Sequence, residues 1–155
     1  MMREIRTCMA ADVFDDPASE ALFAEYAEEC ANPVLGRTVP SRAMYEAIEA
    51  AGAGKCLSVS VDGALVGFAF VLIGPLPHFQ GLFATVESVF LNRQSRRFGL
   101  GLRLMEAVES LARDAGCEAI FFCAPTGSRF LAVLRRRRGY WRTNVVFTKR
   151  LQWTI

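Results

Sequence analysis

The spacing of apolar and polar residues divides the chain into alternating strands and helices. Apolar runs bounded by turn residues predict strands over 4–8, 55–61, 64–73, 85–91 and 117–123. Helical spacing predicts helices over 15–30, 41–51, 102–115 and 128–138. The Asp62-Gly63 pair joins the second and third strands as a hairpin turn, and the Gly- and Pro-containing stretch over 74–81 predicts a loop. This order of elements indicates an α/β domain.

The helix over 102–115 carries a continuous apolar stripe. Its members are Leu100, Leu104, Ala107, Val108, Leu111 and Ala115. Such periodicity predicts that the helix packs on a sheet, and it says nothing about chemistry.

Residues 96–101, Arg-Arg-Phe-Gly-Leu-Gly, lie between the strand over 85–91 and this helix. A glycine-rich turn that opens a helix presents unpaired backbone N–H groups and the positive end of the helix dipole, which suits a phosphate. Gly99 and Gly101 let the backbone approach a ligand closely. Arg96 and Arg97 add charge-assisted donors. The stretch therefore predicts a site for a phosphate-bearing cofactor.

Two common nucleotide motifs do not fit this stretch. A dinucleotide fingerprint needs a third glycine where Leu104 stands, and an acidic residue at the end of the next strand, which ends at Cys123 without one. A P-loop needs Gly-Lys-Ser/Thr at the helix start, where this chain has Gly-Leu-Arg.

Residues 96–101 match every fixed position of the motif Gln/Arg-x-x-Gly-x-Gly/Ala, and the chain there resembles the acetyl-coenzyme A site of the GNAT N-acetyltransferases. The resemblance covers residues 82–151 strongly, through strand, glycine loop, helix, strand, helix and a final strand after Gly139-Tyr140. It implies a single domain over 1–155 whose mixed, mainly antiparallel sheet is flanked by helices. It also implies transfer of an acetyl group from acetyl-CoA to a primary amine, by direct attack in a ternary complex.

The resemblance assigns cofactor contacts to backbone and side chains. Backbone groups of the last strand residues before the loop would pair with the pantetheine arm as an added strand does. The N–H of Val89 would stabilise negative charge on the thioester oxygen, and Ser128, itself a good N-cap, would bind the arm. The implied cofactor-binding residues are Val89, Phe90, Leu91, Arg96, Arg97, Phe98, Gly99, Leu100, Gly101 and Ser128.

Glu87 is the candidate catalytic base. An alkylammonium with a pKa of about 10 must lose a proton before it attacks, and Glu87 is a charged residue in an otherwise apolar strand. A period of two places it on one face with Thr85 and Val89. The alternative is an edge glutamate that pairs with an arginine.

His78 and Phe79 are candidate acceptor-binding residues, because relatives bind the acceptor near the corresponding loop; a solvated loop histidine is the alternative for His78. The chain departs from the family at Arg135, which stands where many members carry a tyrosine that protonates the coenzyme A thiolate. Arginine cannot act as an acid of matched pKa. The acid is left open among Tyr26, Tyr45, Tyr140 and water.

Composition narrows the function classes further. The 155 residues are 52% hydrophobic with a net charge of +2, too small to favour nucleic acid or a membrane surface. The arginine run over 135–138 is typical of a solvated helix C-terminus. Five cysteines without a Cys-x-x-Cys pair, and one histidine, argue against a metal site and for a reducing, cytoplasmic location.

The acceptor is left open between a small-molecule amine and a protein amine, and a homodimer is a further expectation from the family shape. A non-catalytic acyl-CoA-binding or protein-interaction module with the same fold is the alternative function, and the missing tyrosine at position 135 is its main support.

Overall fold

The computed structural model describes residues 1–151. Its centre is a five-stranded sheet in the order β1-β2-β3-β4-β5. The strands are β1 (Arg3–Cys8), β2 (Gly54–Val61), β3 (Ala64–Leu76), β4 (Gly81–Leu91) and β5 (Ala119–Phe122). The first four strands are antiparallel neighbours, whereas β5 runs parallel to β4. The predicted mixed, mainly antiparallel sheet is thus confirmed.

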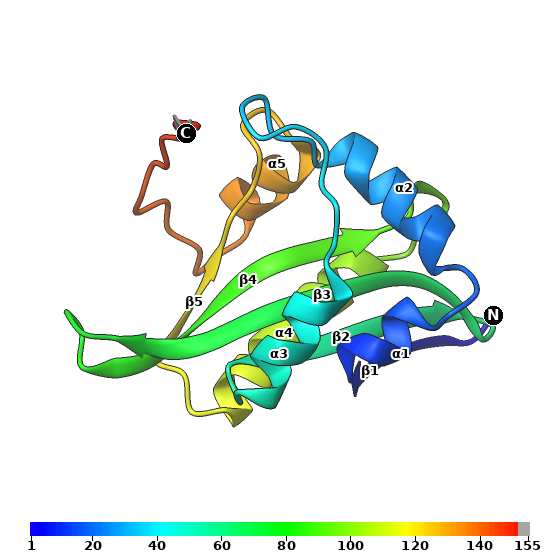
Figure 1. Ribbon diagram of the computed structural model, residues 1–155, viewed down its shortest axis with the longest axis horizontal. Coiled ribbons are helices and arrows are strands. Elements are labelled where there is room, and N and C mark those ends of the chain that lie inside the picture. The colour runs from blue at the N-terminus through cyan, green and yellow to red at the C-terminus, as the bar shows by residue number, and fades with distance from the viewer. Residues whose placement is uncertain (152–155) are drawn as a thin grey trace, which may run out of the picture.

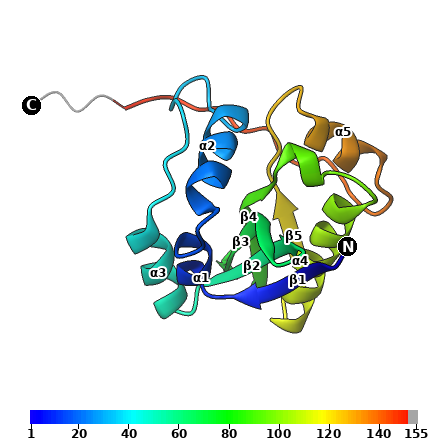
Figure 2. The ribbon, with the colours of Figure 1, turned by 90° about the vertical axis from the view of Figure 1, so that its right-hand side faces the viewer.

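Helices cover both faces of the sheet (Figures 1 and 2). One face carries α1 (Ala10–Phe14), α2 (Ser19–Glu29) and α3 (Arg42–Ala50), and the other carries α4 (Leu100–Asp114) and α5 (Arg129–Arg136). A short 3-10 helix, η1 (Arg93–Ser95), lies between β4 and the glycine loop. We call the first side the α1–α3 face and the second the α4 face.

Each face has its own apolar core. Under α4, the buried residues Leu100, Leu104 and Val108 pack on β3 and β4, as the predicted stripe requires. Met105 and Ala112 are also buried on this helix. On the α1–α3 face the core is aromatic, with Tyr26, Phe68, Phe70 and Phe90 at its centre. These two cores fix the height of α4 and of α3 above the sheet, and thereby position the site described below.

The predicted loop over 74–81 is wrong in extent. Strand β3 continues to Leu76 and β4 already begins at Gly81, so only residues 77–80 form the tip of a long hairpin. Register pairs such as Pro75 with Leu82 continue the ladder through this stretch. Gly and Pro predict a loop from local preference, but cross-strand pairing with an adjacent apolar strand overrides that preference.

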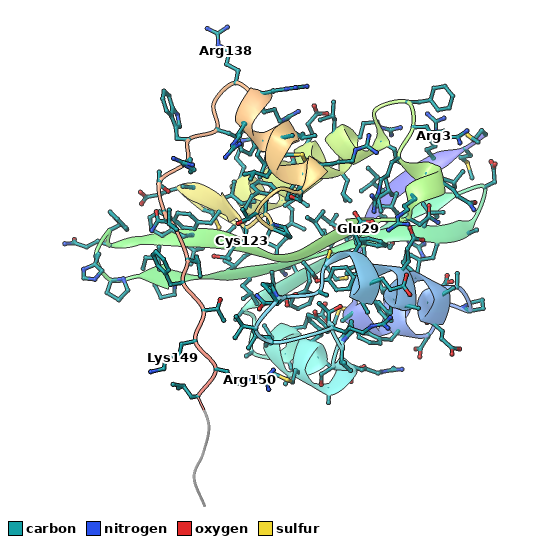
Figure 3. All side chains as sticks on the ribbon, turned by 90° about the horizontal axis from the view of Figure 1, so that it is seen from above. Arg3, Glu29, Cys123, Arg138, Lys149 and Arg150 are labelled. Atoms are coloured by element: carbon teal, nitrogen blue, oxygen red, sulfur yellow. The ribbon has the colours of Figure 1, made fainter. Side chains whose placement is uncertain are left out.

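Three other elements differ from the prediction. Helix α1, with five residues, is too short to give a periodic signal. Helix α5 ends at Arg136, and Arg137 already has extended backbone. Only the first two of the four consecutive arginines are therefore helical. The final strand expected after Tyr140 is not formed within residues 1–151: the segment runs from the end of α5 across to the loop between α2 and α3 (Figure 3). There Arg150 donates to the Val34 and Leu35 carbonyls.

Candidate functional site

Strands β4 and β5 separate halfway along their length. They pair in parallel from Phe83 to Val86 of β4, where Val86 meets Phe122, and β5 then diverges toward α5 (Figure 1). The last four residues of β4, from Ser88 to Leu91, pair with β3 only, on the other side of the strand. This opening exposes a row of strand edge groups, the kind of edge to which an extended ligand adds as a strand.

The backbone orientation along this edge follows from the ladder with β3. The Asn92 N–H donates to the Val66 carbonyl over 2.8 Å, and Phe90 pairs with Phe68 in the same register. Because hydrogen bonding alternates along an antiparallel strand, the peptide groups of Val89 and Leu91 point away from β3. They therefore face the opening, as the resemblance implied for the Val89 N–H.

The glycine loop presents a cluster of free donors at the start of α4. The first intrahelical bond runs from the Arg103 N–H to the Gly99 carbonyl over 3.0 Å. Within residues 1–151, no acceptor meets the N–H groups of Phe98, Gly99, Gly101 or Leu102. Free N–H groups in the first turn of a 15-residue helix and in the two residues before it are suited to an anionic group such as a pyrophosphate.

The space in front of this loop is open. Gly99 has a left-handed backbone with φ of 73°, a conformation that glycine adopts without steric cost. A Cβ built on Gly99 or on Gly101 would meet no described atom within 4 Å. The two glycines therefore leave room for a ligand at the loop rather than for neighbouring protein. Acetyl-CoA fits this loop and the adjoining strand edge.

Arg96 is held by the protein itself. Its Nε donates to the Leu91 carbonyl over 2.7 Å, and its terminal nitrogens reach the Glu29 carboxylate of α2 at 2.8 and 2.9 Å. Its guanidinium also lies 5.3 Å from the centre of the Phe90 ring. The Arg96 side chain therefore ties the loop to α2 instead of projecting toward the free N–H groups. Arg97, in contrast, is exposed on the loop.

Glu87 lies at a β-bulge. Phe70 of β3 pairs with Ser88 and Val71 pairs with Val86, so Glu87 is the extra residue that no β3 residue opposes. A bulge of this kind reverses the alternation of side chains beyond it. Val89 therefore packs toward α4, while Glu87 turns to the α1–α3 face. The predicted common face of Glu87 and Val89 is wrong; period-two alternation holds only for an unbroken ladder.

The carboxylate of Glu87 is exposed and held in place by α3. The Tyr45 hydroxyl donates to Glu87 Oε2 over 2.9 Å. Burial, followed by the charge of Glu87, raises the pKa of Tyr45 above its usual value of 10. The phenol therefore stays protonated at neutral pH and acts as the donor. This places an ionisable carboxylate beside the point where β4 and β5 separate, on the face opposite α4.

The other two tyrosines lie elsewhere. Tyr26 is buried between Phe68 and Phe90. Tyr140 packs against Phe122 and donates to Glu109 of α4. Of the acids left open by the sequence, Tyr45 is thus the tyrosine that contacts Glu87.

The remaining candidates are spread around the opening and the hairpin. Ser128 caps α5 by accepting the Leu131 N–H over 3.0 Å, as predicted from its N-cap position. Arg135 is exposed on α5. His78 and Phe79 lie at the hairpin tip, eight or nine residues along the chain from Glu87. The stretch of β4 from Gly81 to Glu87 alone spans about 20 Å, so the structure does not bring His78 to Glu87.

Two contacts of this site have no counterpart in any local sequence pattern. Tyr45 is 42 residues from Glu87, and Glu29 is 67 residues from Arg96. Both contacts join the α1–α3 face to β4 or to the glycine loop that follows it, which no local pattern encodes.

Across residues 1–151, there is no cluster of three or more His, Cys, Asp or Glu side chains that could hold a metal ion. None of the helices in that range is long and apolar enough to span a membrane.

Comparison with known families identifies the family of the chain. The sequence model of the acetyltransferase (GNAT) family matches residues 10–140. The chain therefore belongs to the GNAT acetyltransferase family, and the predicted acetyltransferase enzyme is confirmed. Among curated proteins, no sequence matches significantly.

Solved structures share the fold at low sequence identity. An aminoglycoside acetyltransferase from an uncultured soil metagenomic sample superposes with a TM-score of 0.74 at 16% identity, covering 98% of this chain and 100% of that one. Glucosamine-6-phosphate N-acetyltransferase from Arabidopsis thaliana gives 0.70 at 14% identity, with 98% and 100% coverage. Ribosomal-protein-alanine N-acetyltransferase from Brucella melitensis biovar Abortus 2308 gives 0.66 at 20% identity, with 96% and 100% coverage.

Proposed function

We propose that the protein transfers an acetyl group from acetyl-CoA to a primary amine in a ternary complex. The observation that carries the proposal is the combination of the opened edge of β4 with the free N–H groups at the first turn of α4. When bound, acetyl-CoA supplies the acetyl group as a thioester. The N–H groups at Phe98, Gly99, Gly101 and Leu102 would hold its pyrophosphate.

The residues at the opening suit the chemistry on the acceptor side. The Val89 N–H stabilises negative charge on the thioester oxygen. Glu87 accepts a proton from the ammonium at its carboxylate, which Tyr45 orients. In the net reaction a C–N bond replaces the C–S bond; one ammonium proton ends on the thiol and the second in solvent.

Donor binding is tested by titration calorimetry with acetyl-CoA. Gly101→Glu adds a negative side chain where no described atom lies within 4 Å, so the variant should fold normally and lose binding by at least tenfold. Ala43→Glu introduces the same side chain at an exposed position of α3 and serves as the control. Equal affinity of both variants would contradict the proposed donor site.

The alternative is a non-catalytic acyl-CoA-binding or interaction module. Arg135 at the usual tyrosine position favours it. Two results together would support this alternative. Glu87→Gln would still bind the donor, and the unaltered protein would transfer acetyl to no amine or protein acceptor.

Two further expectations belong to the proposal. Five free thiols support a reducing, cytoplasmic location. A homodimer is the expected assembly, and light scattering of the purified protein measures its mass directly.

A further inference from the structure

A groove runs along the α1–α3 face beside Glu87. It has a volume of about 370 Å³, and its walls come from α3, the residue before β2 and the β3–β4 hairpin. The lining residues are Ile48, Ala53, Leu72, Ile73, Gly74, Pro75, Leu76, Phe83 and Thr85. Thr85 precedes Glu87 by two residues on β4, and Ile48 follows Tyr45 by three residues on α3. The lining residues Thr85 and Ile48 thus come from the same strand and the same helix as the Glu87–Tyr45 pair, close to it along the chain.

The lining is uncharged and almost entirely apolar. Thr85 contributes its one side-chain hydroxyl. The acidic residues of α3 have partners outside the groove: Glu46 binds Arg42 at 2.7 Å, and Glu49 accepts the Ala10 N–H at 2.9 Å. A ligand in the groove thus meets mainly aliphatic and aromatic carbon. The Glu87 carboxylate belongs to the strand of Thr85, two residues further along, and the Glu118 carboxylate lies near Gly81 at the hairpin end.

Aromatic rings continue the apolar surface. The Phe79 and Phe83 rings lie 5.8 Å apart, and Phe83 stacks on Phe121 of β5 at 6.0 Å. Thr85 and Phe121 are register partners in the parallel pair, so they share the α1–α3 face. Phe79 is 66% exposed. An aromatic or branched aliphatic body gains from this surface, because it removes apolar area from water.

From this arrangement we infer that the acceptor is a monocationic primary amine with an aromatic or branched aliphatic body, which lies in the groove with its amino group at Glu87. The inference rests on the proposed function, because it names the acceptor for that same site. A polycationic amine would place its additional ammonium groups against uncharged walls, and a phosphorylated amine would place its phosphate there. Burial of either charge without a partner is unfavourable.

The test measures kcat/KM for three amines with saturating acetyl-CoA. 2-Phenylethylamine has an aromatic body, ethanolamine lacks an apolar body, and spermidine is a polycation. We expect kcat/KM for 2-phenylethylamine to exceed that for each of the other two amines by at least about tenfold. A few additional carbon groups in an apolar pocket provide discrimination of this size. A higher kcat/KM for spermidine or ethanolamine would overturn the inference.

A matched pair of variants locates the effect in the groove. Ile48→Ala shortens the groove wall, whereas Ile5→Ala makes the same change on β1, at the opposite edge and face of the sheet. Both isoleucines are half-buried, so any general loss of stability is comparable. Ile48→Ala should lower kcat/KM for 2-phenylethylamine about tenfold and leave that for ethanolamine nearly unchanged. An equal loss for both amines, or the same loss in Ile5→Ala, would reject the groove.

Failure of the proposed function has a different signature. Loss of acetyl-CoA binding, or binding without transfer to any of the amines, refutes the proposed transfer and this inference together. Transfer that favours a charged or polar amine refutes the inference alone.

Discussion

The Tyr45 hydroxyl lies 2.9 Å from Glu87 Oε2 and joins α3 to the bulge in β4. The bond connects an element of the α1–α3 face with the strand whose free edge faces the opening. Three structural features therefore occur together at Glu87. The bulge turns its side chain to the α1–α3 face, the protonated Tyr45 phenol holds its carboxylate, and β5 diverges from β4 beside it.

Replacement of the Glu87 carboxylate by an amide should abolish base catalysis. We expect Glu87→Gln to lower kcat by about 10²–10⁴ and to leave the Kd for acetyl-CoA within about twofold. Single-turnover kinetics and calorimetry measure the two quantities. A kcat close to that of the unaltered enzyme would show that a water relay or another group accepts the proton.

Tyr45→Phe removes the positioning hydroxyl while keeping the ring between Phe14 and Phe70. We expect kcat to fall by roughly tenfold with a changed pH profile, because Glu87 loses a charge-assisted hydrogen bond. Tyr140→Phe is the matched control. It removes the hydroxyl that binds Glu109 beside α4, so it should lower stability by about 1 kcal/mol without changing the pH profile of kcat.

The Glu29–Arg96 pair should make stability depend on pH. Burial raises the pKa of Glu29, but the hydrogen bonds from Arg96 and Arg93 outweigh burial, so the pKa lies below its usual value of 4.5. A lowered folded-state pKa gives stabilisation that is present above pH 4.5 and is lost as the pH falls through the folded-state value. The Glu29 and Arg96 side chains are 34% and 27% exposed, which limits the contribution to about 0.5–1 kcal/mol.

Urea unfolding of Glu29→Gln measures this contribution. At pH 7 the variant should be less stable than the unaltered protein by that amount, and the difference should shrink below pH 4.5. A difference that stays constant down to pH 3 would assign the loss to packing rather than to the carboxylate charge.

Two glycines of β3 should differ in their response to alanine. A Cβ on Gly67 would lie 2.6 Å from the Phe90 carbonyl oxygen and 2.8 Å from a methyl group of Leu91, so Gly67→Ala should cost about 1–3 kcal/mol. A Cβ on Gly74 meets nothing within 4 Å. Thermal unfolding of Gly74→Ala should match the unaltered protein within a few degrees, and comparable losses in both variants would contradict the predicted close packing at Gly67.

Features that depend on neighbouring residues were predictable from the sequence. The apolar stripe around Leu104 and Val108, the Asp62-Gly63 turn and the glycines at 99 and 101 are local patterns, and the structure has the helix, hairpin and loop that they predict. Ser128 caps its helix for the same reason. Local geometry also explains why the loop N–H groups are free, because the first turn of any helix lacks internal acceptors.

Features that depend on distant contacts required the tertiary structure. Register between β3 and β4 placed the bulge at Glu87 and so decided which face its carboxylate uses. Packing of α2 and α3 brought Glu29 to Arg96 and Tyr45 to Glu87, across 67 and 42 residues of chain. The sequence by itself determined the order of β1 to β5 and of α2 to α5, and the chemistry of the glycine loop. The structure decided which charged groups meet, because hydrogen bonds and ion pairs depend on atomic distances that folding alone sets.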